Sequence, residues 1–571
     1  MSPPNSKHTI RLQIIWNRLL AIVEEQAQVL KRTAFSPLVR ACGDLSVGVF
    51  DLQGRMLAQA VTGTPGHVNT MAESVKYFIR QFPVATMKPH DAYITNDPWL
   101  GTGHLNDFVL VTPCFFKDEC VALFSCTSHM MDVGGLGAGT EAPDVFAEGL
   151  SIPMLKLLDQ GIVNGSLLEV IRANSRLPVD TIGDTYSLAA CNDLGVRRLQ
   201  ETLAEFSLSG IDEVSEYIIQ QSRAAVLREI ALLPTGTWHH EMDIDGYDEP
   251  LRLRAALTIS ARGMQVDFTG SPAAVSKGIN VPMNYAAAYS AFGIMCAIAK
   301  GVPNNAGSLM PVTIFAPPGC ILNAMKPSPV GARHVVGQML PDLVFGCLSQ
   351  VMPEAVLAEG SSCMWNIAVR GQHTKGDKRG QSYSLAVTTS GGTGARFSKD
   401  GLSATAFPSG IHCMSIEIAE TQVPILFWRK ELRTDSAGAG RMRGGMGQVI
   451  ELEHAEKAAF RLNASFERIK HPARGRFGGL PGAAGFVGLA SGKSLPGKGL
   501  HEIPGGERLV VHTPGGGGIG DVIRRAPELL ERDLIEERIS EAAARRVYAL
   551  MDGRISLQGI GSSPQSKKAG E

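Results

Sequence analysis

Clustered glycines restrict the folds open to this chain more than any other feature of its sequence. There are 63 glycines and 32 prolines in 571 residues, with dense runs at 391–394, 438–447 and 515–520. Glycine weakens helix interiors and suits turns and close backbone approaches, so this richness argues against a helical bundle. A chain of this length is too long for one ordinary core and predicts two to four domains.

The spacing of apolar residues predicts a mixed N-terminal part and a β-rich C-terminal half. Helical spacing is found at 8–32, 187–206, 211–233, 285–299 and 340–350. Short apolar runs predict strands at 45–50, 91–95, 108–112, 121–125, 238–244, 251–259, 264–268, 384–389, 423–431, 448–454, 459–466 and 508–512. A charged, alanine-rich helix is expected at about 526–550. The fold class is therefore α+β.

Changes of pattern near residues 235 and 430 divide the chain into expected domains. We expect an N-terminal domain at 1–235, a central α+β domain at 236–430, and a β-rich region with a terminal helix at 431–558. The polar segment 559–571 is expected to be a disordered tail. The run 515–520 formally fits a dinucleotide fingerprint, but no βαβ unit follows it, so we interpret it as a backbone crossing; a loop lining a pocket is the alternative.

Charge and cysteine usage limit the partners and the compartment. Lys+Arg total 54 and Asp+Glu 55, a formal net charge of -1, so neither nucleic acid nor an anionic membrane is expected as a partner. The ten cysteines form no C-x-x-C pair, which favours reduced thiols. The first residues lack an apolar signal core, and no run approaches the roughly 20 apolar residues of a membrane span. We expect a soluble, cytoplasmic protein.

Two His-x-x-Asp units with the same internal spacing, His104/Asp107 and His129/Asp132, form the densest chemical signal. The segment between them reads as two strands joined near 117–119, and a hairpin would return both units to one end of a sheet. Imidazole and carboxylate ligands suit Zn²⁺, Mn²⁺ or Fe²⁺, which lower the pKa of water or polarise a carbonyl. Asp44, at the start of an apolar strand, could add a carboxylate. The alternative is that these pairs make loop hydrogen bonds and that Asp44 is a turn residue.

Several blocks in order along the chain resemble the hydantoinase B family of the hydantoinase/oxoprolinase/acetone-carboxylase superfamily. They are Arg32–Pro37, Gly66-His67-Val68, Thr95–Pro98, Gly103–Asp107, His129–Gly135, Asp435–Gly440, Arg443–Gly445 and Thr513–Asp521. The chain departs from the commonest pattern at Gly101-Thr-Gly-His104-Leu-Asn-Asp107 and at His129-Met130. The ligand positions survive these changes, whereas the pocket wall changes, so the substrate cannot be carried over.

The resemblance implies a site and its cofactors. The metal-binding positions of the family correspond to His104, Asp107 and His129 in this chain, with Asp44 as the fourth ligand. Asp132 becomes a candidate to orient a ligand or transfer a proton, and His67 a candidate catalytic residue of the pocket. One divalent metal is implied, with zinc favoured over manganese or iron, and the N-terminal domain would hold it. ATP and magnesium would be bound by a partner subunit of actin-like fold, a hydantoinase A-like protein, in a hetero-oligomer.

The resemblance also implies the chemistry, with three alternatives. The leading expectation is ATP-dependent hydrolysis of a cyclic amide (hydantoin, 5-oxoproline or a lactam), in which the partner phosphorylates the carbonyl oxygen and water attacks the activated carbon at the metal. The second is carboxylation of a ketone. The third is a non-catalytic scaffold for the ATP-binding partner.

Overall fold

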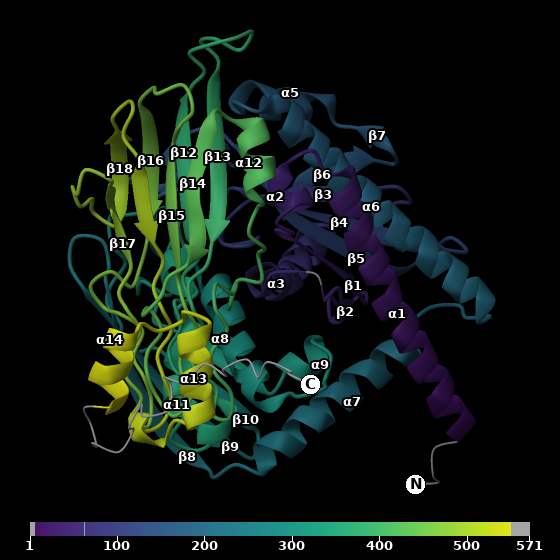
Figure 1. The fold of residues 1–571 in the computed structure, drawn as a ribbon. Helices are drawn as coiled ribbons and strands as arrows, with labels where there is room; N and C mark the ends of the chain where they lie inside the picture. The colour runs from purple at the N-terminus through teal and green to yellow at the C-terminus, as the bar shows by residue number, and fades with distance from the viewer. Residues whose placement is uncertain (1–5, 62, 550–571) are drawn as a thin grey trace, which may run out of the picture.

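The computed structural model describes residues 6–61 and 63–549, and these residues form the α+β, multi-domain fold expected from the sequence. Within them the strands form one sheet of seven strands and three sheets of four strands. Figure 1 shows the seven-stranded sheet on the right, behind the long helix α1, and the strands of the C-terminal half standing upright on the left.

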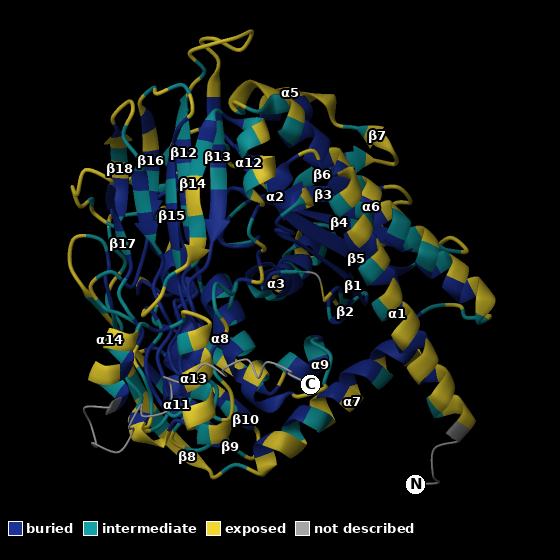
Figure 2. Cartoon of the chain, in the orientation of Figure 1, coloured by how far each residue is buried: buried dark blue, intermediate teal, exposed yellow. Residues whose placement is uncertain are grey.

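The seven-stranded sheet is antiparallel at every pairing and forms the N-terminal core. In sheet order it contains β2 (Met56–Gln59), β1 (Leu45–Phe50), β5 (Glu119–His129), β4 (Asp107–Phe116), β3 (Ala92–Thr95), β6 (Leu155–Asp159) and β7 (Ile162–Val163). Alternation along β4 sends Leu110 to one face and Val109 to the other. The first face is covered by α1 (Ser6–Thr33) and α6 (Pro178–Glu205), and the second by α3 (Pro65–Gln81). Figure 2 shows these strands buried and the outer face of α1 exposed.

The hairpin predicted between the two His-x-x-Asp units is confirmed. Strands β4 and β5 pair antiparallel, with Asp107 directly opposite His129. Lys117 and Asp118 form the connection, and both have positive φ, 51° and 66°. Two consecutive positive φ values are typical of a type I′ turn, whose twist matches that of a hairpin. The turn therefore fixes the register that brings the last residue of β5 beside the first of β4.

The central part packs a four-stranded sheet against two apolar helices. The predicted strands are β8 (Gly236–Ile244), β9 (Leu251–Ser260) and β10 (Gly263–Asp267), and β11 (Val312–Phe315) joins β10 in parallel. The predicted helices α8 (Met283–Ile298) and α11 (Leu340–Leu348) share one core with them. Helix α7 (Asp212–Ala231) contributes Ile218 to the N-terminal core and Val226 to the central core, so it links the two parts.

Two four-stranded sheets face each other around a third core. One contains β13 (Ser382–Thr389), β12 (Trp365–Gln372), β16 (Phe460–Ser465) and β18 (Lys498–Ile503); the other contains β14 (Ile425–Leu432), β15 (Gln448–His454), β19 (Leu509–His512) and β17 (Phe486–Leu489). The expected boundary near residue 430 lies inside β14, and the first sheet takes strands from both sides of it.

The glycine runs pack backbone against backbone beneath these sheets. A Cβ atom on Gly392 would lie 1.9 Å from the Gly445 oxygen, and one on Gly516 would lie 1.9 Å from the Thr393 oxygen. The Gly516 amide donates to the Gly445 oxygen at 3.0 Å, and the Gly518 amide donates to the Leu480 oxygen at 2.9 Å. Because these amides bond to neighbouring runs, Gly515–Gly520 is a backbone crossing and not a nucleotide-binding turn.

The helix predicted at 526–550 is broken, which corrects the sequence-based expectation. Helix α13 (Pro527–Ile535) ends before Glu537, whose φ of 54° turns the chain, and Ser540 then caps α14 (Glu541–Ala543), followed by a π-helical turn at Ala544–Ala549. Short helices not predicted from the sequence are α2 (Pro37–Arg40), α4 (Val145–Glu148), α5 (Gly165–Asn174), α9 (Ala306–Leu309), α10 (His334–Gly337) and α12 (Ile416–Gln422). The expected tail at 559–571 lies outside the described residues. None of the described helices is long and apolar enough to cross a membrane.

Candidate metal centre

Three strand ends of the seven-stranded sheet bring predicted ligand residues to one place. Asp107 is the first residue of β4, and His129 is the last residue of β5. Asp44 immediately precedes β1, and its carbonyl accepts a hydrogen bond from the His129 amide at 3.2 Å. Since β1, β5 and β4 are neighbours in the sheet, strand order alone places Asp44, His129 and Asp107 side by side.

The fully buried Asp107 carboxylate lies at the centre of the cluster. Its Oδ1 lies 2.7 Å from His104 Nε2 and 3.0 Å from His129 Nδ1. Ligand atoms of these three residues all lie within 4.8 Å of one another, a spacing suited to a single cation. Asp44 lies at the edge of the group, with its Oδ2 4.0 Å from His129 Nδ1.

The orientation of His104 favours a bound cation. Its Nδ1 lies 3.2 Å from the Gly331 carbonyl oxygen and its Nε2 lies 2.7 Å from Asp107 Oδ1, so both ring nitrogens face acceptors. Burial and the nearby Arg333 lower the pKa of His104 to about 3, which favours the neutral ring. A neutral ring has one proton for these two acceptors. A metal ion bound by Nε2 and by Asp107 Oδ1 would leave that proton for the Gly331 carbonyl.

His67 joins the cluster from the first turn of α3. Its Nε2 lies 2.9 Å from Asp107 Oδ2, and its Nδ1 lies 3.5 Å from Asp44 Oδ1. Burial alone would lower the pKa of His67, but Asp107 and Asp44 outweigh it and raise the pKa above its ordinary value. His67 Nδ1 and Asp44 Oδ1 are buried without a hydrogen-bond partner in the described part of the chain. Both atoms have hydrogen-bonding capacity left for a ligand.

Arg333 and Thr102, which the sequence did not indicate, hold the other side of Asp107. Arg333 Nη2 donates to Asp107 Oδ2 at 2.6 Å, and Thr102 Oγ1 donates to the same oxygen at 2.7 Å. Burial would raise the pKa of Asp107, yet the histidines and Arg333 hold it well below its ordinary value. Thr102 could have been predicted from the sequence because it lies two residues before His104. Arg333 lies in a distant loop, and no sequence pattern indicates it.

Glu148 supports the loop that orients His104. Its Oε1 accepts hydrogen bonds from the amides of Val330 and Gly331, both at 2.6 Å, and the Gly331 carbonyl in turn faces His104. Burial raises the pKa of Glu148 from 4.5 to about 7, although the two amides oppose the shift. The folded state therefore favours the neutral acid.

We expect Glu148 to make stability depend on pH. A carboxyl whose pKa is raised on folding contributes stability below pH 4.5 and loses it as the pH rises through about 7, a contribution of about 3 kcal/mol in all. Glu148→Gln stays neutral at every pH, so its Tm should fall less than that of the wild type between pH 5 and pH 8. Equal slopes of Tm against pH in the two proteins would rule this out.

Asp132, predicted to help at the metal, lies away from the cluster. Its carboxylate accepts from Arg176 Nη1 at 2.8 Å and from the Arg176 amide at 2.5 Å. It lines a separate groove with Arg176 instead of the cavity that contains the histidines. The repeated His-x-x-Asp spacing thus brings only the first aspartate into the cluster, because β5 ends at His129 and the chain then turns away.

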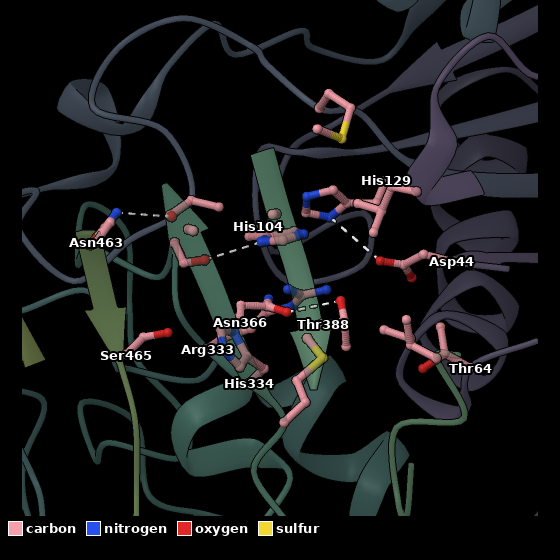
Figure 3. A pocket seen from close by; sticks show the side chains of 18 of the residues that line it. Asp44, Thr64, His104, His129, Arg333, His334, Asn366, Thr388, Asn463 and Ser465 are labelled. Atoms are coloured by element: carbon pink, nitrogen blue, oxygen red, sulfur yellow. Dashed lines mark hydrogen bonds and ion pairs between the residues drawn. The ribbon is translucent and has the colours of Figure 1, made fainter. Parts of the chain in front are cut away.

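A cavity beside the cluster is closed by the face of the sheet that contains β12. Asn366 on β12, Thr388 on β13 and Ser465 on β16 line this wall. His334 adds a buried ring whose Nε2 has no partner among the described residues. Figure 3 shows His129 and Asp44 on the right, Asn463 and Ser465 on the left, and His104 and Asn366 between them. Sequence reasoning missed this wall because its polar residues stand singly on three separate strands.

A match over nearly the whole sequence shows which family the chain belongs to. Residues 8–522 match the Hydantoinase B/oxoprolinase family. The chain belongs to this family. The resemblance seen in its motifs is thereby confirmed over most of its length.

Individual relatives of this hydantoinase B family member are cyclic-amide enzymes by name. The caprolactamase subunit beta of Pseudomonas jessenii is 28% identical over 97% of this chain and 98% of its own. A 5-oxoprolinase of Dictyostelium discoideum is 27% identical over 90% of this chain, which spans only 40% of that longer protein.

Two solved structures share the fold of this chain. The ATP-dependent caprolactamase of Pseudomonas jessenii superposes with a TM-score of 0.84 at 25% identity, over 94% of this chain and 96% of that chain. A nucleotide-free acetone carboxylase superposes with a TM-score of 0.83 at 19% identity, over 95% of this chain and 79% of that chain. At that identity, the second match shows a shared fold only.

Proposed function

We propose that this chain is the metal-binding subunit of an ATP-dependent hydrolase that opens cyclic amides. The observation that carries the proposal is the clustering of ligand atoms of His104, Asp107 and His129 within 4.8 Å of one another, beside a cavity that the two histidines line. A partner subunit of hydantoinase A type would bind ATP and magnesium. Relatives named caprolactamase and 5-oxoprolinase support lactam-like rings as the substrate class.

The donor set fits one divalent metal. His104, Asp107 and His129 supply two imidazoles and one carboxylate, and Asp44 would add a second carboxylate. Nitrogen and oxygen donors in this ratio suit zinc, with manganese or iron as alternatives. When bound, such a metal lowers the pKa of water and polarises a carbonyl group.

The other residues would bind the ring and manage protons. An amide resists attack until its oxygen is activated, so the partner would transfer the terminal phosphoryl group of ATP to that oxygen. Water then adds to the activated carbon, and the ring C–N bond breaks as the ring nitrogen takes a proton. A second water hydrolyses the resulting acyl phosphate to the carboxylate and inorganic phosphate. His67, whose pKa is raised and whose Nδ1 has no hydrogen-bond partner among the described residues, is placed to donate that proton. Asn366 and Ser465 would orient the ring.

The named relatives favour the hydrolase over a ketone carboxylase. The caprolactamase subunit beta and the 5-oxoprolinase match 97% and 90% of this chain, whereas the acetone carboxylase, at 19% identity, shares the fold only. Nothing comparable favours a scaffold, since the cluster offers a complete donor set.

The test is ring opening by the purified complex of this chain with its ATP-binding partner. With ATP, we expect it to open 5-oxoproline, caprolactam or hydantoin, with ADP formed for each ring opened, and to do neither without the partner. Controls lack ATP or carry labelled bicarbonate with acetone. Incorporation of bicarbonate without ring opening would assign the carboxylase instead.

A further inference from the structure

The wall opposite the metal ligands ends in an arginine. On β12, Asn366, Ala368 and Arg370 alternate onto one face, and their β13 partners in register are Thr388, Ala386 and Ser384. All six residues line the cavity. The two alanines form a flat apolar floor. Asn366 and Thr388 lie at one end of it, 3.0 Å apart, and Arg370 lies at the other.

Arg370 lacks the carboxylate partner that the buried arginines have. Arg333, Arg443, Arg468 and Arg525 are buried, and each pairs with an aspartate within 3.2 Å. Arg370 is only partly exposed, and within residues 6–61 and 63–549 its guanidinium has neither a carboxylate within 4.0 Å nor a hydrogen bond. Even partial removal of a guanidinium from water is costly without a partner, so an anion bound to Arg370 would offset that cost.

The surroundings of Arg370 add positive charge and little to neutralise it. Burial and the nearby Arg176 lower the pKa of Arg370, and Asp132 opposes them only partly. The Asp132 carboxylate is already bound by Arg176, at 2.8 Å. Arg370 lines both the cavity of the metal cluster and the open groove that contains Arg176. Arg370 therefore lies where the cavity and the groove meet.

Glycines in the loop after β5 make room for this side chain. A Cβ on Gly137 would lie 2.8 Å from Arg370 Nη2, and one on Gly139 would lie 2.3 Å from Asn463 Nδ2. Gly137 also has a φ of 76°, which side-chain-bearing residues rarely adopt. Side chains at Gly137 and Gly139 would therefore collide with the guanidinium and with the Asn463 amide, two donors that line the cavity. The Asn463 amide also donates to the Ala138 oxygen at 3.4 Å.

We propose that Arg370 is the binding site for an anionic group of the compound held beside the metal cluster. The group is a carboxylate or a phosphoryl group, the two oxyanions that a guanidinium fork binds in a bidentate manner. A carboxylate would belong to the substrate itself, and a phosphoryl group to its activated form. The identity of that compound as a cyclic amide rests on the proposed function; the anion site does not.

Binding to the full chain alone separates these cases. The probes are 5-oxoproline, 2-pyrrolidinone, which is the same ring without the carboxylate, and inorganic phosphate, each titrated by calorimetry. The variants are Arg370→Gln and Arg370→Lys, with Arg262→Gln as the matched control at an exposed turn between β9 and β10. Loss of a charge-assisted bidentate pair should weaken binding roughly 10- to 100-fold.

Each outcome decides the inference. A substrate carboxylate is assigned if the wild type prefers 5-oxoproline to 2-pyrrolidinone and Arg370→Gln abolishes that preference, with partial rescue in Arg370→Lys. A phosphoryl group is assigned if phosphate binding is lost in Arg370→Gln while both rings bind alike. The inference is overturned if Arg370→Gln binds 5-oxoproline and phosphate like the wild type, or if the wild type binds neither. If Arg370 binds anions but the complex does not open rings, the proposed function is wrong and the anion site stands.

Discussion

Replacing Asp107 by asparagine should abolish ring opening, with a loss in kcat/KM of well over roughly 100-fold. Changing a residue that only orients a metal ligand already lowers activity or metal affinity by about 10- to 100-fold, and Asp107 contacts all three histidines of the cluster. Its Oδ1 faces His104 and His129, and its Oδ2 faces His67 and Arg333. The measurement is the ATP-dependent hydrolysis rate of the purified complex.

The loss must be separated from misfolding, because Asp107→Asn also leaves the buried Arg333 without its carboxylate, which costs about 3–5 kcal/mol of stability. His129→Ala serves as the second variant: its side chain is 16% exposed and pairs with no cation. It should keep the wild-type circular dichroism and Tm but lose activity to a similar extent. A folded His129→Ala variant with wild-type activity would exclude His129 from the site.

Gly516→Ala is expected to destabilise the chain by about 3 kcal/mol or more, or to prevent its soluble expression. The added methyl group would lie 1.9 Å from the Thr393 oxygen and 2.3 Å from the Thr393 carbonyl carbon. These are backbone atoms that cannot rotate away, so the two backbone segments must move apart. The expected loss of stability therefore lies at the upper end of the range for overpacked sites. Chemical denaturation with a tryptophan fluorescence readout measures the change.

The matched control is Gly165→Ala, the same substitution where no atom lies within 4 Å of the new Cβ. Gly165 begins α5, so alanine there should be neutral or stabilise by up to about 1 kcal/mol. Equal stabilities of the two variants would show that the glycine runs have room for side chains, contrary to the packing described above.

The sequence predicted the part of the site that depends on short-range pairing. The apolar runs on either side of 117–119 indicated a hairpin, and a hairpin of that length necessarily returns His129 to Asp107. Asp44 followed because it precedes an apolar strand, although only the strand order β1-β5-β4 shows that this strand is their neighbour. Local pattern was sufficient where the residues in contact lie on adjacent strands.

Long-range contacts could not be predicted in this way. Arg333 reaches the cluster from a distant loop and Glu148 acts on it from the short helix α4, and single charged residues at such places form no pattern in the sequence. The wall that ends in Arg370 comes from the C-terminal half, where alternation predicts strands but not the sheet they face. Helix α3 was missed although Pro65 at its start and Val68, Met71, Val75 and Phe78 at helical spacing indicate it.

The prediction for Asp132 rested on a repeated spacing, which suggested that the two His-x-x-Asp units have the same role. His129 and Asp132 have the spacing of His104 and Asp107, but His104-Leu-Asn-Asp107 is a turn leading into β4, whereas Asp132 follows the end of β5. The two units therefore meet different neighbours, and Asp132 pairs with Arg176. Its proton-transfer role has no geometric support, and His67 is the better candidate.

The central claim is that this cluster holds a divalent metal, and elemental analysis of the protein purified without chelator tests it most directly. The wild type should contain close to one zinc, manganese or iron per chain, and His129→Ala and Asp107→Asn should contain almost none, while Arg262→Gln matches the wild type. A metal-free wild type, or variants that keep the metal in full, would contradict the account and leave the subunit as a scaffold for its partner.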